Sequence, residues 1–431
     1  STFFSIKNTM FYRILIVLLL LGNNVFAQRS YTISEAVAEA RNNNPLLRTE
    51  KYNINIASSY ITSAGLRPNP IFNNQNLQLM NSQNLNFFDY GKSKDKTNLW
   101  SGNSRQVWFQ LTKPMLLGNI RAKRVDFAKQ GVVSASTAYS DLNRSVSYQA
   151  ALKWMDVWLL KTNLLTYKDA KENVDSLVYI NENRLKNQVI TPIELMRTQV
   201  LSEQYSLQLK SFSNQYGNEL RNLRYITGIK DSIEINDQIN LATFDFFENK
   251  DTLVNIAIDR RSDLAYARSN IELSKKNIVV QKAAGLPYLE AGVIYNPQNT
   301  ISYVGTYATL SVPIFNRNQG EREKSQFMLK QSESDVNARE TQIRIEVLNA
   351  YNSFITYRNN LKEFQTIVSK SQKVLSTVRY SYLKGNTTLI DFLDAQRSYL
   401  ETQRLYNEAL FNFRKSYIDV LYTTGLISDI N

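Results

Sequence analysis

Two residue types that carry much of enzyme chemistry are missing from this chain. Its 431 residues include no cysteine and no histidine. Thiol nucleophiles, histidine general bases and Cys/His metal sites are therefore excluded. The six methionines are scattered and form no cluster. The sequence predicts no catalytic residue, no metal site and no cofactor, and therefore a protein that is not an enzyme.

Residues that break helices are also scarce, with 14 glycines and 8 prolines. This composition is typical of long helices, because proline and glycine destabilise helix interiors. The length allows one large domain or two of medium size. The net charge is +13, but basic and acidic residues are interspersed and no basic block stands out. A solvated surface explains this pattern, and we expect no nucleic-acid partner.

Long apolar runs are absent beyond the start of the chain. The run Ile14–Leu21 follows Lys7 and Arg13, and Val25-Phe-Ala27 offers a small-x-small cleavage pattern. This indicates a secretory signal peptide over residues 1–27, cleaved after Ala27. The run is shorter than the roughly 20 residues that cross a bilayer as a helix. We therefore expect an exported protein whose membrane contact, if any, is made by strands.

The chain contains an internal duplication. Three short segments recur in the same order in the second half: 64–66 as 284–286, 110–116 as 309–315, and 224–228 as 421–425. The sequence therefore predicts a first repeat over 28–228, a connector over 229–250, a second repeat over 251–425 and a tail over 426–431.

Each repeat predicts a long antiparallel helical hairpin. Residues 119–186 and 318–384 contain no proline, and about 67 residues form a helix about 100 Å long. The return helices begin at two capping signals, Thr191-Pro192-Ile193-Glu194 and Thr388 with Asp391. The second return helix is apolar or aromatic every seven residues, at Phe392, Tyr399, Tyr406, Phe413 and Val420. This period predicts coiled-coil packing. Lys171 and Asn181 interrupt the apolar series of the first long helix.

Each repeat also predicts a pair of strands, over about 70–114 and about 287–313. The segments alternate in polarity, as when Val107, Phe109 and Leu111 alternate with polar neighbours. Strands of about ten residues suit a tilted membrane barrel, although a sheet in a soluble domain has the same pattern. Four strands cannot close a barrel. Membrane-spanning strands would therefore require several chains, and three chains would supply twelve.

These parts, in this order, resemble the TolC-type outer-membrane efflux family over essentially the whole mature chain. The sharpest matches are Leu310-Ser-Val-Pro-Ile-Phe315 and the segment from Tyr382 to Gln396. The resemblance implies an α+β membrane protein that forms a homotrimer. Its four strands per chain would make a 12-stranded barrel in outer-membrane lipid, and its helices a periplasmic tunnel tapering to a closed tip. The implied partners are a periplasmic adaptor and an inner-membrane pump of the RND or ABC type.

The resemblance also points to three pore-constriction residues, Asp391, Asp394 and Tyr382. In the family, an acidic pair at the start of the last return helix lines the constriction, and Asp391 and Asp394 match it. A trimer would place six carboxylates around a narrow axis, which favours cations. The alternative is that both acids only complement the positive end of their helix.

Tyr382 matches a tyrosine that helps to hold the family's prototype closed. The arginine expected at the next gate position is Thr387 in this chain, and no partner is recognisable in residues 187–191 of the first repeat. The segment Arg67-Pro-Asn-Pro70 resembles the cation-efflux branch of the family.

The sequence therefore predicts an outer-membrane exit duct of a tripartite efflux or type I secretion system. The alternative is a secreted or periplasmic coiled-coil structural or adhesive protein, in which the apparent strands are extended linkers.

Overall fold

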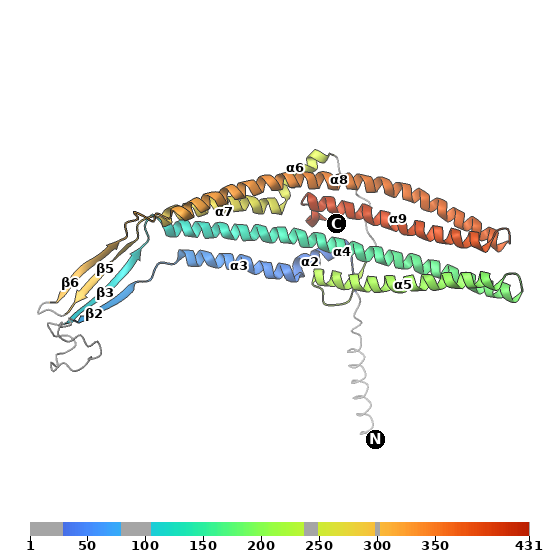
Figure 1. Ribbon diagram of the computed structural model, residues 1–431, viewed down its shortest axis with the longest axis horizontal. Helices are drawn as coiled ribbons and strands as arrows, with labels where there is room; N and C mark the ends of the chain where they lie inside the picture. The colour runs from blue at the N-terminus through green and yellow to red at the C-terminus, as the bar shows by residue number, and fades with distance from the viewer. Residues whose placement is uncertain (1–28, 79–104, 237–248, 298–301, 431) are drawn as a thin grey trace, which may run out of the picture. The chain divides into compact units, whose positions relative to one another are not determined.

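The computed structural model describes residues 29–78, 105–236, 249–297 and 302–430 (Figure 1). The predicted signal peptide, most of the connector and the turns between paired strands lie outside these ranges. The chain forms two compact units. Within the described ranges, the first comprises the residues up to Arg48, then Leu142–Arg260, and the residues from Ile343 onward; the second comprises Thr49–Asp141 and Arg261–Gln342. Each sequence repeat contributes to both units.

The two long helices confirm the predicted hairpin arms. Helix α4 covers Ile120–Lys186 and helix α8 covers Gln319–Leu383. Their return helices are α5, Pro192–Thr227, and α9, Leu389–Thr423. Figure 1 shows each return helix beside its long helix. Among the described residues, no helix combines the length and the apolar character needed to cross a membrane.

Both return helices start with the predicted caps. The Glu194 carboxylate accepts hydrogen bonds from the Thr191 backbone N–H at 2.8 Å and from its hydroxyl at 3.1 Å. In the second hairpin, the Thr388 hydroxyl accepts from the Asp391 N–H at 3.2 Å. These bonds satisfy donors that the first turn of a helix otherwise leaves unpaired.

The duplication is also visible in the backbone. Residues with positive φ occupy matching places: Asn119 and Asn318 before the long helices, Gln188 and Gly385 in the hairpin turns, and Gly228 and Gly425 after the return helices. The last two pairs keep the same spacing along the chain as the repeated segments 224–228 and 421–425. The repeat in sequence is therefore also a repeat in conformation.

The first unit is organised around a buried tryptophan on α4. Trp154 is fully buried, and its indole N–H donates to the Tyr31 carbonyl at 2.9 Å. Tyr31 ends strand β1, Arg29–Tyr31, which pairs in parallel with β4, Ile233–Ile235. The unit also contains helix α2, Ile33–Asn43, helix α6, Lys250–Arg260, and a short 3-10 helix, Ile427–Asp429. The indole thus ties α4 to the two-stranded sheet.

Asn44 lies in this unit and joins α2 and α5 to the first turn of α3. It follows α2 and precedes α3, Pro45–Gly65. Its side-chain oxygen accepts from the Leu46 N–H at 2.8 Å, and its side-chain amide donates to the Ile226 carbonyl at 2.7 Å. Asn44 therefore caps the start of α3 and also binds the last turn of α5.

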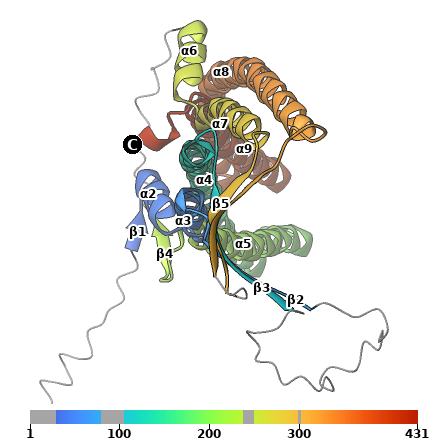
Figure 2. The same cartoon turned by 90° about the vertical axis from the view of Figure 1, so that its left-hand side faces the viewer.

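The second unit contains one four-stranded antiparallel sheet, whose strands are labelled in Figure 1 and which Figure 2 shows nearly edge-on. Its strands are β2, Ile71–Gln78; β3, Arg105–Met115; β5, Leu289–Asn296; and β6, Tyr303–Leu310, in the order β2-β3-β5-β6. Helix α7, Ser262–Ala284, precedes β5. Three strands have eight residues and β3 has eleven, so both predicted strand pairs are confirmed.

The sheet has one largely apolar face. The register places Leu289 opposite Leu310, Ala291 opposite Ala308, Val293 opposite Thr306, and Tyr295 opposite Val304. Val293 in turn lies opposite Leu111 of β3. On the same face the rings of Phe72, Phe109 and Tyr295 follow one another across three strands, at 6.2 and 6.4 Å between centroids. The alternation in the sequence had indicated these faces for β3, β5 and β6.

Strand β2 does not follow this separation of the sheet into an apolar and a polar face. Asn74 lies opposite Phe109, and Asn76 lies opposite Val107. Since directly paired residues point to the same side of a sheet, the polar residues of β2 lie on the otherwise apolar face. Leu77, which is paired with Gln106, lies on the polar face.

Gly228 provides a test of the packing between α2 and α5. Its φ is 69°, and an added Cβ would lie 2.2 Å from the Asn43 carbonyl oxygen. We expect Gly228→Ala to destabilise the protein by about 1–3 kcal/mol, because both the backbone conformation and the close approach disfavour a side chain. Thermal unfolding of the purified protein, followed by the circular dichroism of its helices, measures this.

The matched control is Gly131→Ala in α4, where nothing lies within 4 Å of the new methyl group. There alanine should be neutral or should stabilise the helix by about 0.5–1 kcal/mol. Equal melting temperatures for the two variants would contradict the packing described for Gly228.

Candidate functional site at the ends of the helical hairpins

The two hairpins end in turns of the same backbone design. The first turn comprises residues 187–191 and the second residues 384–388. The Val189 N–H donates to the Arg184 carbonyl, and the Asn386 N–H donates to the Ser381 carbonyl, each at 2.9 Å. Together with the positive φ of Gln188 and Gly385, these bonds close the carboxyl ends of α4 and α8. The two hairpins of the duplicated chain therefore end in equivalent turns.

Next to these turns, the hairpins share one apolar core, here called the tip core. It contains residues from all four helices: Ala170, Val174, Leu177, Leu201, Tyr205, Tyr382, Leu389, Phe392, Leu393 and Leu400. Burial raises the pKa of Tyr205 to about 12, so this phenol is neutral at physiological pH. The tip core holds the first hairpin against the second.

Tyr382, the predicted gate tyrosine, is buried in the tip core. Its hydroxyl donates to the side-chain oxygen of Asn181 on α4 at 2.9 Å. Its ring stacks on Phe392 of α9, with 5.4 Å between centroids. The Arg184 guanidinium lies 4.9 Å from the ring centroid. Tyr382, on α8, therefore contacts both α4 and α9 through its ring and its hydroxyl.

Asn181 and Arg184 are the partners that sequence reasoning did not find. They lie on α4, before the turn at 187–191 where a partner was sought. Asn181 is fully buried, and Arg184 also donates to the Leu383 carbonyl at 3.2 Å. The signal was present, because Asn181 interrupts the apolar series of the first long helix. A polar residue at an apolar position of a coiled coil often marks a specific pairing.

A second buried polar contact joins the hairpins. The Asn407 amide on α9 donates to Asn163 and to Thr166 of α4, both at 3.1 Å. The spacing of Asn163 and Asn181 along α4 equals a whole number of helical turns, so the two asparagines share one side of the helix. That side of α4 therefore makes two polar contacts with the second hairpin.

Asp391, the first acid of the predicted pair, is exposed and serves as a helix cap. One carboxylate oxygen accepts from the hydroxyl of Thr388 at 2.6 Å, the hydroxyl of Thr387 at 2.8 Å and the N–H of Thr388 at 3.2 Å. These bonds, led by that of the Thr388 hydroxyl, hold the pKa of Asp391 below its ordinary value. The carboxylate is therefore ionised at neutral pH, and the capping alternative describes its contacts within the chain.

Asp394 has different surroundings from Asp391. It is exposed, and no hydrogen bond or ion pair links its side chain to another part of the described chain. Its three-residue separation from Asp391 on α9 places both acids toward one side of the helix. Within the described chain no hydrogen bond links either acid to Tyr382, whose side chain is buried while the two acids are exposed.

Thr387 replaces the arginine expected at the gate position, and its hydroxyl binds Asp391 within its own hairpin. The cation that contacts the gate tyrosine is supplied instead by Arg184 of the first hairpin. The guanidinium beside Tyr382 therefore comes from the first hairpin and not from position 387.

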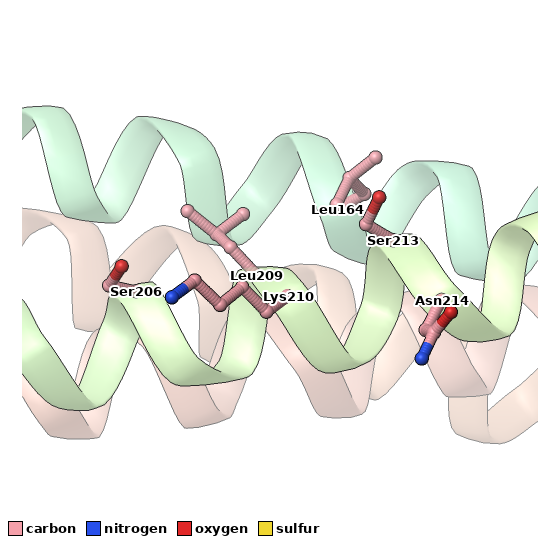
Figure 3. Close-up of a pocket in the computed structure, with 6 residues that line it drawn as sticks. All are labelled: Leu164, Ser206, Leu209, Lys210, Ser213 and Asn214. Carbon is pink, nitrogen blue, oxygen red and sulfur yellow. The ribbon is translucent and has the colours of Figure 1, made fainter.

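The surface of the first hairpin carries open grooves. One, of about 450 Å³, is lined by Leu164 of α4 and by Ser206, Leu209, Lys210, Ser213 and Asn214 of α5 (Figure 3). Lys210 is the one ionisable residue of this lining. The described residues contain no group of three or more acidic side chains placed to hold a metal ion. The grooves are therefore better suited to packing against a helix than to catalysis or metal binding.

Comparisons with known proteins agree with this architecture. Residues 253–421 match the family described as outer membrane efflux protein. No protein of curated function matches the sequence.

Several solved structures share the fold. CusC, studied for transmembrane channel formation, aligns with a TM-score of 0.74 and 15% identity over 92% of this chain and 93% of its own. The CmeC outer membrane channel of Campylobacter jejuni aligns with a TM-score of 0.74 and 16% identity, over 91% of this chain and 85% of CmeC. The outer membrane protein VceC of Vibrio cholerae aligns with a TM-score of 0.70 and 14% identity, over 91% of this chain and 96% of VceC. Residues 253–421 therefore match the outer membrane efflux protein family, and the chain shares its fold with these outer membrane channel structures over about nine tenths of its length.

Proposed function

We propose that this protein is the exit duct of a tripartite efflux or type I secretion system in an outer membrane. It would conduct substrates passively from an inner-membrane pump of the RND or ABC type through a periplasmic adaptor. In this role it is not an enzyme, and the chain's own part is to form a wall, a tunnel and a gate.

The four-stranded sheet is the observation that carries this proposal. Each of its outer strands, β2 and β6, has one neighbour in the described chain, so each has one unpaired edge. Unpaired backbone groups in hydrocarbon are unfavourable by several kcal/mol each, so a membrane sheet must close on itself. Three chains would close a barrel of twelve strands, with the face of Val293 and Leu310 toward lipid.

The secreted coiled-coil alternative requires the strand segments to be extended linkers. They are instead paired in register across three antiparallel ladders. We therefore favour the duct. We further propose that the repeats at 28–228 and 251–425, joined by the connector 229–250, are the two structural halves of its wall, preceded by the signal peptide 1–27.

The hairpin ends suit a gate in this duct. Tyr382 would hold the second hairpin against the first through Asn181. Asp391 and Asp394 of three chains would provide six carboxylates at the constriction, with Asp391 also capping its own helix.

The mass of the particle extracted by detergent from the outer-membrane fraction tests the duct. We expect three copies of the cleaved chain, because three sets of four strands make the twelve-stranded barrel of the proposed duct. A monomer in detergent, or a product found only in the soluble fraction, would reject the duct and leave the coiled-coil scaffold.

The acidic ring is tested best through Asp394, because changing it leaves the Asp391 cap intact. We expect Asp394→Asn to lower the cation-to-anion permeability ratio about fivefold, since a charge about 4 Å from an ion in water contributes about 1 kcal/mol. Reversal potentials of the purified protein in planar bilayers measure this ratio.

Glu272→Gln in α7 is the matched control, because it removes one exposed carboxylate away from the hairpin turns. It should leave the ratio unchanged. If Asp394→Asn behaves like this control, Asp394 does not line the constriction.

The proposed gate contact, the hydrogen bond from Tyr382 to Asn181, can be tested by removing the hydroxyl oxygen of Tyr382. Tyr382→Phe removes the hydrogen bond to Asn181, which contributes about 1 kcal/mol net, so the open state should gain about fivefold in population. Single-channel recording would show this as longer or more frequent openings.

Tyr380→Phe is the control for the gate variant, because Tyr380 lies two residues away on α8 and is 64% exposed. Its channels should open like those of the unchanged protein. Indistinguishable openings in the two variants would show that the Tyr382 bond does not hold the gate.

A further inference from the structure

The four strands of the sheet join their helices at one end of the second unit. Strand β2 follows α3, β3 leads into α4, β5 follows α7, and β6 leads into α8 (Figure 1). The register keeps these strand ends level, because Met115 lies opposite Leu289 and Leu289 lies opposite Leu310. The segments at this end of the strands are here called the junction: residues 65–71, 112–124, 282–290 and 310–318.

The junction has a large excess of positive charge. It contains a single acid, Glu290, and seven cations: Arg67, Lys113, Arg121, Lys123, Arg124, Lys282 and Arg317. All of these cations are exposed except Lys123, which is half-buried. The next acids along α4 and α8 are Asp126 and Glu321, and the latter pairs with Lys324.

The chain itself does not neutralise these charges. Within the described residues, none of the seven cations forms an ion pair with a carboxylate. Arg121 and Arg317 each donate to a backbone carbonyl of the junction, at 3.2 and 3.0 Å. The carboxylate of Glu290 accepts from the Thr112 hydroxyl instead. The junction therefore has cationic groups that are free to bind an external anion.

Lys113 lies on the apolar face of the sheet. It stands two residues from both Leu111 and Met115 on β3, so the three side chains share one face. It is exposed and lies opposite Ala291 of that face. Glu290 lies on the other face, because its partner in β3 is the residue after Lys113. The apolar face therefore ends at a cation, and the acid is kept away from it.

Exposed apolar side chains surround these cations. Between β6 and α8, Phe315 is 91% exposed, and Val312 and Ile314 are 68% and 62% exposed. Tyr288, just before β5, is 42% exposed. Exposed apolar groups gathered in one place mark a surface that contacts a partner or a membrane. The junction thus presents apolar and cationic groups together.

This combination fits a phospholipid headgroup layer better than water. In the proposed duct the sheet crosses the hydrocarbon and the helices extend into the periplasm, so the junction lies level with the headgroups of the periplasm-facing leaflet. Lysine and arginine bind phosphate oxygens through charge-assisted hydrogen bonds, and basic groups beside a membrane-spanning segment attract anionic lipids.

We propose that the junction binds anionic glycerophospholipids of the periplasm-facing leaflet. Lys113 and Arg317 would bind headgroup phosphates, and Ile314 and Phe315 would lie against the upper part of the acyl chains. The inference rests on the proposed function and names the lipid class that the duct selects as its neighbour.

A lipid leaflet is the fitting occupant because the apolar face of the sheet continues into the junction. Leu310 ends β6 on that face and is 55% exposed, and the exposed Val312 follows two residues later. An acidic protein would satisfy the cations, but it would not explain why they adjoin a face that is apolar along the strands.

The lipid preference can be measured on the full-length protein in bilayers of phosphatidylcholine. Spin-labelled phosphatidylglycerol and spin-labelled phosphatidylcholine are added in turn, and electron paramagnetic resonance gives the fraction of each that is held at the protein surface. We expect the anionic lipid to be preferred severalfold. The preference should fall at high salt, because salt screens exposed charges.

Lys113→Gln should lower this preference about twofold to fivefold, since one basic group beside an anionic membrane contributes a factor of about five. Lys113→Arg should retain it, because the charge is kept. Arg317→Gln should lower it by a similar factor, and this variant replaces Lys113→Gln if the latter does not assemble.

The matched control is Lys370→Gln, which removes one exposed cation from α8 far along the chain from the junction. It should leave the preference unchanged. An equal loss in Lys370→Gln and Lys113→Gln would show a general effect of net charge and overturn the assignment to the junction.

The mass of the particle separates this inference from the duct. Trimers that hold the two lipids equally would overturn the lipid site, leave the duct standing and assign the cations to an acidic protein. Monomers, or a product found only in the soluble fraction, would overturn the duct itself.

Discussion

The packing of two helical hairpins on one apolar core is the interaction on which the rest of the first unit depends. Four helices contribute to this tip core, and Tyr382 contacts both hairpins within it. Helices as long as α4 and α8 cannot bury a stripe alone, so their stability depends on a partner along their length. The core supplies that partner near the turns, and it also positions the groups of the candidate gate.

The sheet is subject to a different constraint, the pairing of its backbone groups. Within the described chain this pairing ends at β2 and β6. The proposed trimer would satisfy both open edges. The duplication suits this proposal, because each repeat supplies one strand pair and one hairpin.

Much of the fold was predictable because its signals are local. The first long helix was predicted to end at residue 186 and does so, since capping and turn preferences act over a few residues. The strand faces followed from alternation, as in the pairing of Ala291 with Ala308. Strand β2 shows the limit, because the alternation along one strand does not say which of its faces aligns with the apolar face of its neighbours.

The sequence by itself determined that cysteine and histidine chemistry is excluded, that the chain is duplicated, and in which order its helices and strands follow. It also determined the bounds of the long helices. Each of these depends on composition or on short-range preferences. Only the tertiary structure decided which residues meet. The partner of Tyr382 is Asn181, 201 residues away, and Asp391 binds Thr387 and Thr388 of its own hairpin. Contacts between distant segments depend on how whole helices pack, and a helix period shows that a residue faces a partner without showing which residue the partner presents.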